Sequence, residues 1–517
     1  MTSMLIFICV ISSAFSARIL GFFPIPSISH QVVFRAYTQE LAKRGHELVI
    51  ITPNPALPKE RPKDNITEID VGFSYEYITD YVSKIDIYKR GVIADVDTVA
   101  YSLYKGFVHL IREDLEFPEV KKIVEDKDQH FDLIVTEGIL SLPLILSYFH
   151  KAPVIQITSF HASPENWATV GALTGHPVFY PNFNRNKFGK LSLMESVREL
   201  FYEFKLRYEF WRVKNEEDRI IKELYGLQAP SIDELKDNVD MLFVNTNVMF
   251  ANNRPVPPSV VYLGALHLLP LKEIPQDLRT YLDNSKTGVV YVSLGTNVPT
   301  SKLDKEMLDA FLNAFESLPY DIIWKVDGDH LKDLPKNVKI QKWFPQRDLL
   351  VHPNVKVFIT QGGLQSTDEA IDAGVPLVGI PMLGDQFFNV HKYVELGIGV
   401  KVNSMTITAE ELTEAVNTVI KDGSYRKNIL RLRSVMRDQP EKPIQRAMWW
   451  TEHVLRHGGA RHLRAPTANM SWAQYLMIDF ILSILLIIFG IPIACYMVLK
   501  SCLRIFFKSK SRKHKLN

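Results

Sequence analysis

The sequence predicts an α/β protein with two open, doubly wound domains and a single C-terminal transmembrane helix. Strand and helix patterns alternate in the N-terminal region, and the same alternation begins again near Gly288. Residues 480–499 form a 20-residue run without a charged residue, which is long enough to cross a bilayer. With 517 residues, 46% of them hydrophobic, the chain can fill two domain cores.

The first domain is predicted from three consecutive elements. Residues 18–23 form a short apolar strand, residues 31–44 form an amphipathic helix that ends at Gly45, and residues 47–52 form the next strand. Such a βαβ unit typically opens a parallel sheet. We place this domain at residues 18–255.

The second domain begins with the apolar run VVYVSLGT after Gly288 and continues through the runs DIIWKV and VKVFIT. The loop at residues 252–264, rich in Pro and Asn, separates the two domains. We place the second domain at residues 256–440, followed by a returning helix and a juxtamembrane segment at residues 441–479. Two facing domains of this kind set the carboxyl ends of both sheets toward one cleft, where ligands bind.

The densest functional pattern lies at residues 343–389. Within it the strand at residues 355–359 breaks at Thr360 into the pair Gly362-Gly363, and a helix follows. Backbone N–H groups at such a turn point toward an anion, which indicates a phosphate-bearing ligand. A Gly-Gly turn alone is weak evidence, because most such turns are only connections.

The helix after this turn has its own start and stop signals. Ser366 and Glu369 stand three residues apart, which predicts a capping box at the beginning of the helix, and Gly374 ends it. The second apolar strand of this region follows directly.

The flanking residues add what the Gly-Gly turn lacks. Trp343 and Phe344 offer flat surfaces for a base, and the amide of Gln346 can read a base edge. Asp385 and Gln386 supply acceptors and donors suited to sugar hydroxyls. Together these side chains predict a nucleotide-sugar site.

This ordered set resembles the signature of the UDP-glycosyltransferase family, the membrane-bound enzymes that attach a sugar to small lipophilic molecules. The resemblance covers about the whole chain and is closest to invertebrate members, among the UDP-glucosyl and UDP-glucuronosyl transferases. It implies two facing Rossmann-like domains, the GT-B fold, with the acceptor in the N-terminal domain and the UDP-sugar in the C-terminal one. It also implies inverting transfer of a sugar, most simply glucose, to an acceptor hydroxyl. Glucuronic acid and galactose share the hydroxyls that Asp385 and Gln386 would bind, so both stay open as alternatives.

The resemblance assigns donor contacts residue by residue. Trp343 matches the residue that stacks on uracil, Gln346 the one that bonds base or ribose, Glu369 the acid that accepts from ribose hydroxyls, and Asp385 with Gln386 the pair that holds the transferred sugar. Each of these residues also has a purely structural explanation: in the same order, a buried Trp, a loop amide, a capping-box acid and a helix N-cap.

The sequence departs from the family pattern at Gln361, where His usually precedes the Gly pair. An amide donates to a phosphate oxygen but carries no charge. We therefore expect donor binding to depend more on the helix N-terminus and the neighbouring turn. The residues expected to bind UDP are Ser293, Gly295, Thr296, Trp343, Phe344, Gln346, Gln361, Gly362, Gly363, Gln365, Ser366 and Glu369.

His30 is the candidate catalytic base. It follows the first strand, in a loop that leads into the first helix, where the positive helix end favours neutral imidazole. The resemblance makes it the residue that deprotonates the acceptor and makes Glu137, where the family commonly has Asp, the acid that orients it. The alternatives are a helix-capping His30 and a solvated carboxylate at the end of a strand.

We expect no cofactor and no metal, with backbone dipoles stabilising the leaving group. The Asp-x-Asp motifs used by metal-dependent transferases occur at Asp95–Asp97 and Asp327–Asp329, but neither has a supporting context. A non-catalytic carrier of lipophiles or UDP-sugars, or an interaction partner, remains the alternative function, and UDP release would distinguish it. The formal net charge of +2 predicts no nucleic-acid surface.

The two ends of the chain predict its compartment. Residues 1–17 have a short apolar run followed by Ser16 and Ala17, which is typical of a signal peptide. The run at 480–499 is followed by a basic tail, residues 500–517, with seven Lys and Arg and no acid. The positive-inside rule then gives a single-pass type I membrane protein with a cytosolic tail and lumenal domains.

The tail also suggests the organelle. Lys513 and Lys515 resemble a dilysine-type retrieval signal for the endoplasmic reticulum, and a stop-transfer charge cluster is the alternative. The three cysteines, Cys9, Cys495 and Cys502, all lie outside the mature lumenal part, so that part folds without disulfides. Asn65 begins a glycosylation sequon. The resemblance implies a homodimer, which is common among relatives, but the sequence itself does not specify the oligomeric state.

Overall fold

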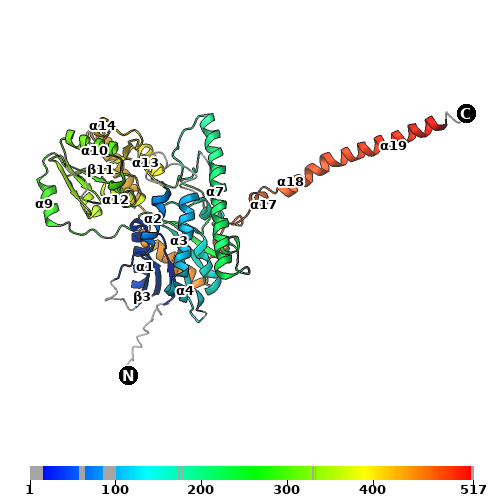
Figure 1. The fold of residues 1–517 in the computed structure, drawn as a ribbon, viewed down its shortest axis with the longest axis horizontal. Helices are drawn as coiled ribbons and strands as arrows, with labels where there is room; N and C mark the ends of the chain where they lie inside the picture. Colours follow the sequence, from blue (N-terminus) through cyan, green and yellow to red (C-terminus); the bar gives the residue numbers. More distant parts are fainter. Residues whose placement is uncertain are drawn as a thin grey trace, which may run out of the picture. The chain divides into compact units, whose positions relative to one another are not determined.

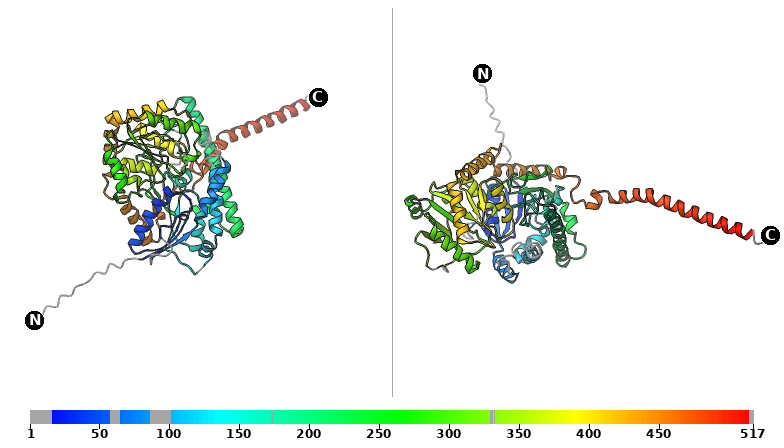
Figure 2. Two further views of the ribbon diagram at one scale, coloured as in Figure 1. Left: turned by 60° about the vertical axis from the view of Figure 1, so that its left-hand side comes forward. Right: turned by 90° about the horizontal axis from the view of Figure 1, so that it is seen from above.

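The computed structural model describes residues 16–57, 65–85, 101–126, 128–172, 175–176, 178–328, 331 and 333–513. The chain forms two compact units, a large one that ends at Ala465 and a C-terminal one from Pro466 to Asn517. The large unit contains two parallel sheets, each with helices on both faces (Figures 1 and 2). Because both faces are covered, strands such as Leu133–Glu137 are buried at every position.

The first sheet has seven strands in the order β3-β2-β1-β4-β5-β6-β7, and every neighbouring pair is parallel. The strand order reverses between β1 and β4, which is where a doubly wound sheet opens a crevice at its carboxyl end. The strands are β1 (Arg18–Phe22), β2 (Glu47–Thr52), β3 (Ile66–Asp70), β4 (Leu133–Glu137), β5 (Val154–Thr158), β6 (Val239–Val244) and β7 (Val260–Tyr262). The helices are α1 (Ile28–Lys43), α2 (Ser74–Ile85), α3 (Tyr104–Glu116), α4 (Pro118–Glu125), η2 (Leu142–Leu144), α5 (Ile145–His150), α6 (Pro164–Val170), α7 (Leu193–Tyr225) and α8 (Ile232–Lys236).

The second sheet has six parallel strands in the order β10-β9-β8-β11-β12-β13, with its reversal between β8 and β11. The strands are β8 (Val289–Ser293), β9 (Asp321–Lys325), β10 (Val338–Gln341), β11 (Val355–Thr360), β12 (Leu377–Gly379) and β13 (Gly399–Lys401). The helices are α9 (Gln276–Asn284), η3 (Thr300–Lys302), α10 (Lys305–Ser317), α11 (Gln346–Leu350), α12 (Leu364–Ala373), α13 (Gln386–Glu395), α14 (Ala409–Lys421), α15 (Gly423–Arg437) and α16 (Pro443–His457), with η4 (Arg461–Leu463) after them.

One predicted boundary shifts. The predicted domain boundary at residue 255 falls before β7, which pairs with β6 and so still belongs to the first sheet. Helix α16, within the predicted returning segment, packs back on the first half: the Tyr37 hydroxyl and Thr451 Oγ1 lie 2.7 Å apart. The predicted loop at residues 252–264 is therefore wrong at its C-terminal end, which contains the short strand β7.

Helix α1 begins earlier than predicted. It starts at Ile28 rather than at residue 31, because Ser27 has an extended backbone and its carbonyl already accepts hydrogen bonds from the N–H groups of His30 and Gln31. His30 therefore lies in the first turn of α1 and not in the loop before it, which places its ring closer to the positive helix end.

The C-terminal unit contains α17 (Trp472–Tyr475), α18 (Ile478–Leu485), the π-helical turn η5 (Leu486–Gly490) and α19 (Ile491–Lys513). Residues Ile478–Ile505 form one helical run that is long and apolar enough to cross a membrane, with a mean hydropathy of 2.6 in its best window. The π turn comes just before Pro492, whose ring displaces the preceding carbonyls from regular α-helix geometry. The predicted run at 480–499 lies inside this helix, whereas most of the predicted signal peptide lies outside the described residues.

Candidate active site

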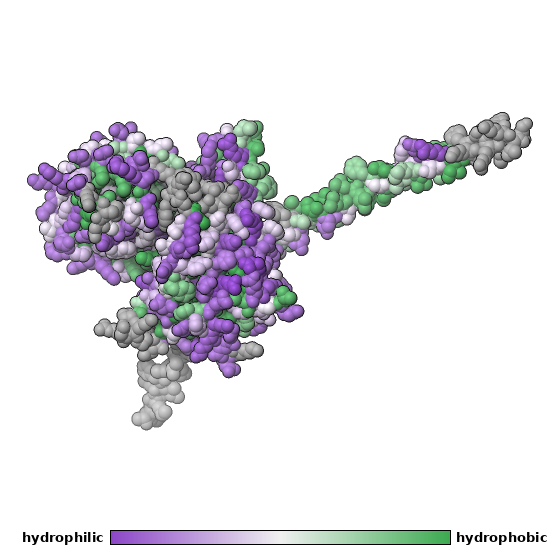
Figure 3. Space-filling view, in the orientation of Figure 1, coloured by the Kyte–Doolittle hydropathy of each residue, from purple (hydrophilic) through white to green (hydrophobic). Residues whose placement is uncertain are grey.

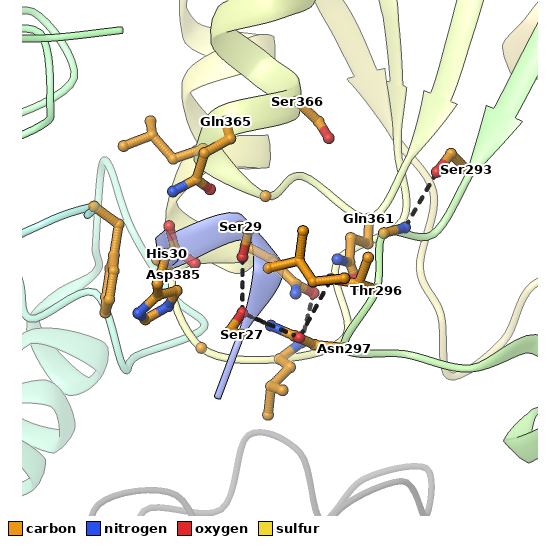
Figure 4. Close-up of a pocket in the computed structure, with 18 of the residues that line it drawn as sticks. Ser27, Ser29, His30, Ser293, Thr296, Asn297, Gln361, Gln365, Ser366 and Asp385 are labelled. Atoms are coloured by element: carbon orange, nitrogen blue, oxygen red, sulfur yellow. Dashed lines mark hydrogen bonds between the residues drawn. The ribbon is translucent and has the colours of Figure 1, made fainter. Parts of the chain in front are cut away.

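A cleft of about 1130 Å³ lies at the carboxyl ends of the strands of both sheets. The first half contributes the loops after β1 and β5, and the second half contributes the loops after β8, β11 and β12 (Figure 4). The predicted site residues that line it are His30, Ser293, Gly295, Thr296, Trp343, Phe344, Gln346, Gln361, Gly363, Gln365, Ser366, Glu369, Asp385 and Gln386. Two predicted residues, Glu137 and Gly362, do not line the cleft and lie behind it.

His30 and Glu137 form a close pair. The imidazole Nδ1 lies 2.6 Å from Glu137 Oε1, and the other carboxylate oxygen accepts a longer hydrogen bond from the Ile25 N–H at 3.4 Å. The Glu137 side chain is 1% exposed and that of His30 is 13% exposed. The longer Glu side chain therefore reaches the ring directly, as the prediction of an orienting acid requires.

This contact fixes the tautomer of His30. An ionised carboxylate only accepts hydrogen bonds. Nδ1 therefore carries the hydrogen atom and donates a hydrogen bond to Glu137. Neutral His30 then holds its lone pair on Nε2. The arrangement is that of a general base whose imidazolium form would be stabilised by a buried carboxylate.

Asp385 lies beside His30 (Figure 4) and stands at the N-terminus of α13. Burial raises the pKa of its carboxyl to about 6, and a hydrogen bond from Asn389 and the nearby charge of His30 partly offset that rise. Asn389 Nδ2 donates to Asp385 Oδ2 at 2.8 Å and also to the Gly362 carbonyl at 2.9 Å. Asp385 is thus held in place and faces the cleft with an oxygen available to a ligand.

Gln386 is the second residue predicted to hold the sugar. Its Oε1 accepts hydrogen bonds from the backbone N–H groups of Met382 and Leu383, at 2.9 and 2.8 Å. These bonds shape the turn that carries Asp385. Its Nε2 makes no hydrogen bond within the described part of the chain and is the atom that remains for a ligand.

Gln361 lies over Gly295. A Cβ added at Gly295 would come 2.2 Å from Gln361 Nε2 and would displace this amide, and the φ of +77° at Gly295 separately favours glycine. Gln361 Oε1 is buried without a hydrogen-bond partner among the described residues. Lys325 Nζ donates to the Gly295 carbonyl at 2.6 Å, and burial lowers the pKa of this lysine. Sequence reasoning missed Lys325, which brings a cation to the side of the cleft where Gln361 carries none.

The two glycines after Gln361 differ. Gly362 has a φ of +93°, and a Cβ there would lie 2.6 Å from Val390 Cγ2. Gly363 caps α12 with ordinary dihedral angles, and a Cβ there would meet nothing closer than 3.8 Å. Gly362 is therefore required by conformation and packing, whereas Gly363 leaves the backbone open to the cleft.

The predicted capping box is wrong. Helix α12 begins at Leu364 with Gly363 as its N-cap, so Ser366 and Glu369 lie inside the helix. They converge instead on Gln346, whose Nε2 donates to Ser366 Oγ at 3.0 Å and to Glu369 Oε2 at 2.7 Å. Burial raises the pKa of Glu369 to about 7, and the Gln346 hydrogen bond opposes that rise.

The oxygen of the Gln346 amide is also hydrogen-bonded within the protein: Oε1 accepts a hydrogen bond from the Tyr291 hydroxyl at 3.1 Å. The amide that was expected to read a base edge is thus bound to protein groups in this structure. Glu369 and Ser366 still line the cleft beside it, where ribose hydroxyls would meet them.

The two aromatic residues predicted to flank a base differ in exposure. Trp343 is 59% exposed, and Lys325 Nζ lies 5.2 Å from the centre of its ring. Phe344 is 1% exposed and packs edge-on against Tyr291 in the core. Only Trp343 therefore offers a ring face to a base, and Phe344 serves mainly as a core residue beneath the cleft.

Hydrogen bonds between the two halves surround the cleft. Asn297 Nδ2 donates to Ser27 Oγ at 3.2 Å (Figure 4), and Gln365 Nε2 donates to the Ser159 carbonyl at 2.9 Å. His161 Nε2 donates to Asn389 Oδ1 at 2.9 Å. Sequence reasoning found none of these pairs except Gln365 itself, because each joins residues more than 200 positions apart.

Opposite the donor residues, the cleft wall is apolar. It comes from the loop after β1, the start of α1, α2, the region of α3, and the segments after β4 and β5. The apolar residues of this wall are Ile25, Ile28, Val32, Ile78, Val82, Leu103, Phe107, Ile139, Phe160 and Phe183. His30 lies against this wall, with its ring 5.2 Å from that of Phe160. A lipophilic molecule held here would present a hydroxyl to His30.

Two other predicted features have specific environments. The Asn65 amide donates to the carbonyls of Ala42 and His46, at 2.7 and 3.0 Å, so its glycosylation, which stays a prediction, would replace one of these bonds.

Of the two Asp-x-Asp motifs, the structure describes Asp327, which accepts from the backbone N–H of Ser301 at 3.0 Å and from the Thr300 hydroxyl. Asp95, Asp97 and Asp329, the other acids of the two Asp-x-Asp motifs, lie outside the described residues.

Comparisons with known proteins agree with this geometry. The model of the family described as "UDP-glucoronosyl and UDP-glucosyl transferase" matches residues 22–515. The ecdysteroid UDP-glucosyltransferase of Spodoptera littoralis nuclear polyhedrosis virus is 45% identical over 93% of this chain and 96% of its own. That of Lymantria dispar multicapsid nuclear polyhedrosis virus is 44% identical over 94% and 97%.

An insect protein and a solved structure extend the comparison. UDP-glucosyltransferase 2 of Dactylopius coccus is 29% identical over 99% of this chain and 98% of its own. The crystal structure of the glycotransferase of kitacinnamycin superposes with a TM-score of 0.57 and 18% identity, covering 84% of this chain and 99% of that one, and shows the shared fold. The chain therefore belongs to the UDP-glucuronosyl and UDP-glucosyl transferase family, and it is a UDP-glycosyltransferase of the GT-B fold.

Proposed function

We propose that this enzyme transfers glucose from UDP-glucose to a hydroxyl of a lipophilic acceptor, with inversion at the anomeric carbon. The observation that carries the proposal is the His30–Glu137 pair at 2.6 Å, placed between an apolar wall and the residues of the second sheet. The names of the similar viral and insect proteins support glucose as the sugar. The viral names also make ecdysteroids the first acceptors to test, ahead of the broader conjugation or detoxification role.

In the proposed reaction, His30 Nε2 accepts the proton of the acceptor hydroxyl as its oxygen bonds to the anomeric carbon. The bond from that carbon to the UDP oxygen breaks on the opposite face. Glu137 stabilises the imidazolium that forms, because its carboxylate already holds Nδ1–H. Asp385 and Gln386 would hold the sugar in line, with Asn389 fixing the position of Asp385.

No metal takes part in the proposed mechanism. The charge that develops on UDP would meet the N-terminus of α12 and the N–H groups of the turn at Ser293–Thr296. Lys325 stands near the same turn and would add positive charge. In metal-dependent transferases a divalent cation stabilises the charge that develops on the leaving UDP. Addition of a chelator therefore tests the proposal directly.

The test uses membranes that contain the full-length chain, an ecdysteroid or a simple phenol as acceptor, and UDP-glucose, UDP-galactose or UDP-glucuronate as donor. We expect a β-glucoside from UDP-glucose in the presence of EDTA, and its loss in His30→Ala. An α-glycoside would overturn inversion, and loss of activity with EDTA would overturn metal independence. Donor binding without UDP release across all acceptors would favour a carrier.

We also propose that the enzyme is a single-pass type I protein of the endoplasmic reticulum membrane. The apolar helix Ile478–Ile505, the basic tail after it and the N-terminal apolar run support this orientation. Protease added to sealed microsomes should remove only the tail and spare the domains. Digestion of the domains in sealed vesicles would reverse the orientation.

A further inference from the structure

The N-terminal half of α7 exposes an apolar face. Nine residues between Leu193 and Trp211 are exposed; Arg198 is the only charged one, and the other eight are apolar or aromatic. Their exposed fractions run from 45% at Leu200 to 80% at Leu193. Figure 3 shows this apolar surface along the upper part of α7. The eight residues are Leu193, Met194, Val197, Leu200, Phe201, Phe204, Tyr208 and Trp211.

These eight residues form one continuous stripe. At 3.6 residues per turn they fall within about 120° of the helix circumference and extend over about 27 Å of its length. Single exposed apolar residues are ordinary on protein surfaces, but a continuous patch of this kind marks a contact with another apolar surface. We call this stripe the α7 face.

The buried side of the same half of α7 is mixed, with three glutamates beside Leu206 and Phe210. Glu199 is buried and accepts two hydrogen bonds from Arg185, at 2.8 and 3.1 Å. The buried Glu203 and Glu209 pair with arginines one turn along the helix. A helix on a water-facing surface has the opposite arrangement, with apolar residues inside and charges outside. In this half of α7, eight apolar or aromatic side chains are exposed and only two are buried, which is the reverse of the usual distribution on a helix that faces water.

We propose that the α7 face lies in the interfacial region of the lipid bilayer that anchors this enzyme. The inference rests on the membrane anchorage proposed above. Only 12 residues, 466–477, join the large unit to the apolar helix Ile478–Ile505, so they hold that unit within about 40 Å of a bilayer. Among the side chains of the face, Trp211, Tyr208 and the phenylalanines are the kind enriched at membrane interfaces.

The position of α7 relative to the cleft gives this contact a use. The segment that leads into α7 contains Phe183 and Asn184, and both line the cleft on the side of the apolar wall. A lipophilic acceptor dissolved in the bilayer would then reach the cleft along this segment without crossing bulk water. Arg198 is exposed next to the edge of the α7 face, where its long side chain would suit a headgroup phosphate.

The test is fluorescence quenching in the full-length chain, reconstituted in phosphatidylcholine vesicles. Phe204→Cys places a label on the α7 face, and Val435→Cys on α15 is the matched control, since Val435 is 53% exposed and Phe204 64%. Cys9, Cys495 and Cys502 are replaced by alanine in both. With doxyl-labelled lipids we expect a several-fold larger loss of fluorescence at position 204 than at position 435.

Each other outcome overturns the proposal. Equal quenching at both positions would mean that the α7 face has no special contact with lipid. No quenching at position 204, with cross-linking of two copies through that cysteine, would assign the face to a dimer interface. The absence of both quenching and cross-linking at position 204 would mean that the α7 face is exposed to water. Release of the whole chain from the membrane by alkaline carbonate would instead refute the membrane anchorage. The quenching at positions 204 and 435 is therefore compared only for protein that stays in the membrane after this treatment.

Discussion

His30 and Glu137 lie 107 positions apart in the sequence, yet Nδ1 of the imidazole and Oε1 of the carboxylate are 2.6 Å apart. They meet because β1 and β4 are neighbouring parallel strands, so that the first turn after β1 and the last residue of β4 share one end of the sheet. Glutamate fills the place where the family usually has aspartate, and the contact is made nonetheless.

The first prediction concerns that pair. Glu137→Gln removes the charge that stabilises protonated His30 and also permits the wrong tautomer, so we expect kcat to fall by about 10²- to 10⁴-fold. Glu137→Asp should retain much more activity, provided that the shorter side chain still reaches Nδ1. Initial rates at saturating UDP-glucose measure both. If Glu137→Gln retained wild-type kcat, the orienting role would be wrong.

Much of the fold followed from the sequence. Strands β1, β2, β8, β9 and β11 and the helix between the first two were predicted within a few residues, because a buried parallel strand is a continuous apolar run bounded by turn signals. β7 was missed because it has only three residues and lies within the Pro-rich stretch at 252–264, which was predicted to be a loop. The early start of α1 was missed because Ser27 caps it through its backbone and not its side chain.

The site was only partly predictable. Fourteen of the sixteen predicted catalytic, UDP-binding and sugar-binding residues line the cleft, and most of them come from the short stretch at residues 343–386 around Gly362-Gly363. The sequence could not show that the Gln346 amide donates hydrogen bonds to Ser366 and Glu369, because these bonds depend on how the two helices are placed relative to each other. Lys325 gave no signal, since a lysine at the end of a strand is ordinary.

The second prediction separates the two glycines. Gly362→Ala forces a side chain into the left-handed region and against Val390 Cγ2, so we expect a loss of about 1–3 kcal/mol of unfolding free energy. Gly363→Ala, with φ of −60° and open space, is the matched control and should keep wild-type stability. Thermal unfolding in detergent measures both. Equal stability of the two variants would contradict the packing argument.

The third prediction concerns the pH dependence of stability. Glu217 accepts hydrogen bonds from the N–H groups of Ser141 and Leu142, both at 2.7 Å, and burial raises its pKa to about 7. Because the pKa in the folded state is above that in the unfolded state, this group stabilises the fold fully below about pH 4.5. That contribution, about 3 kcal/mol at most, is lost as the pH rises toward 7.

Glu217→Gln removes this titration while its Oε1 can still accept both N–H groups. We expect the variant to match the wild-type Tm near pH 4.5 and to exceed it near pH 7.5. Some pH dependence should remain in the variant, because burial also raises the pKa of Glu369 and of Asp385. If the variant and the wild type had parallel Tm profiles across this range, Glu217 would be ionised throughout.

The last prediction tests the donor side of the cleft. Trp343 is the one of the two predicted aromatics whose ring is exposed in the cleft, so Trp343→Ala should remove the surface on which uracil stacks. Stacking of a base on an aromatic ring contributes about 1–3 kcal/mol, so the KM for UDP-glucose should rise roughly 5- to 100-fold. Because Trp343 is largely exposed, the Tm should change little. Trp449→Ala is the control, since that ring is 46% exposed on α16 and does not line the cleft. A KM for UDP-glucose that rose equally in both variants would point to a general loss of structure, and an unchanged KM in Trp343→Ala would place the base elsewhere in the cleft.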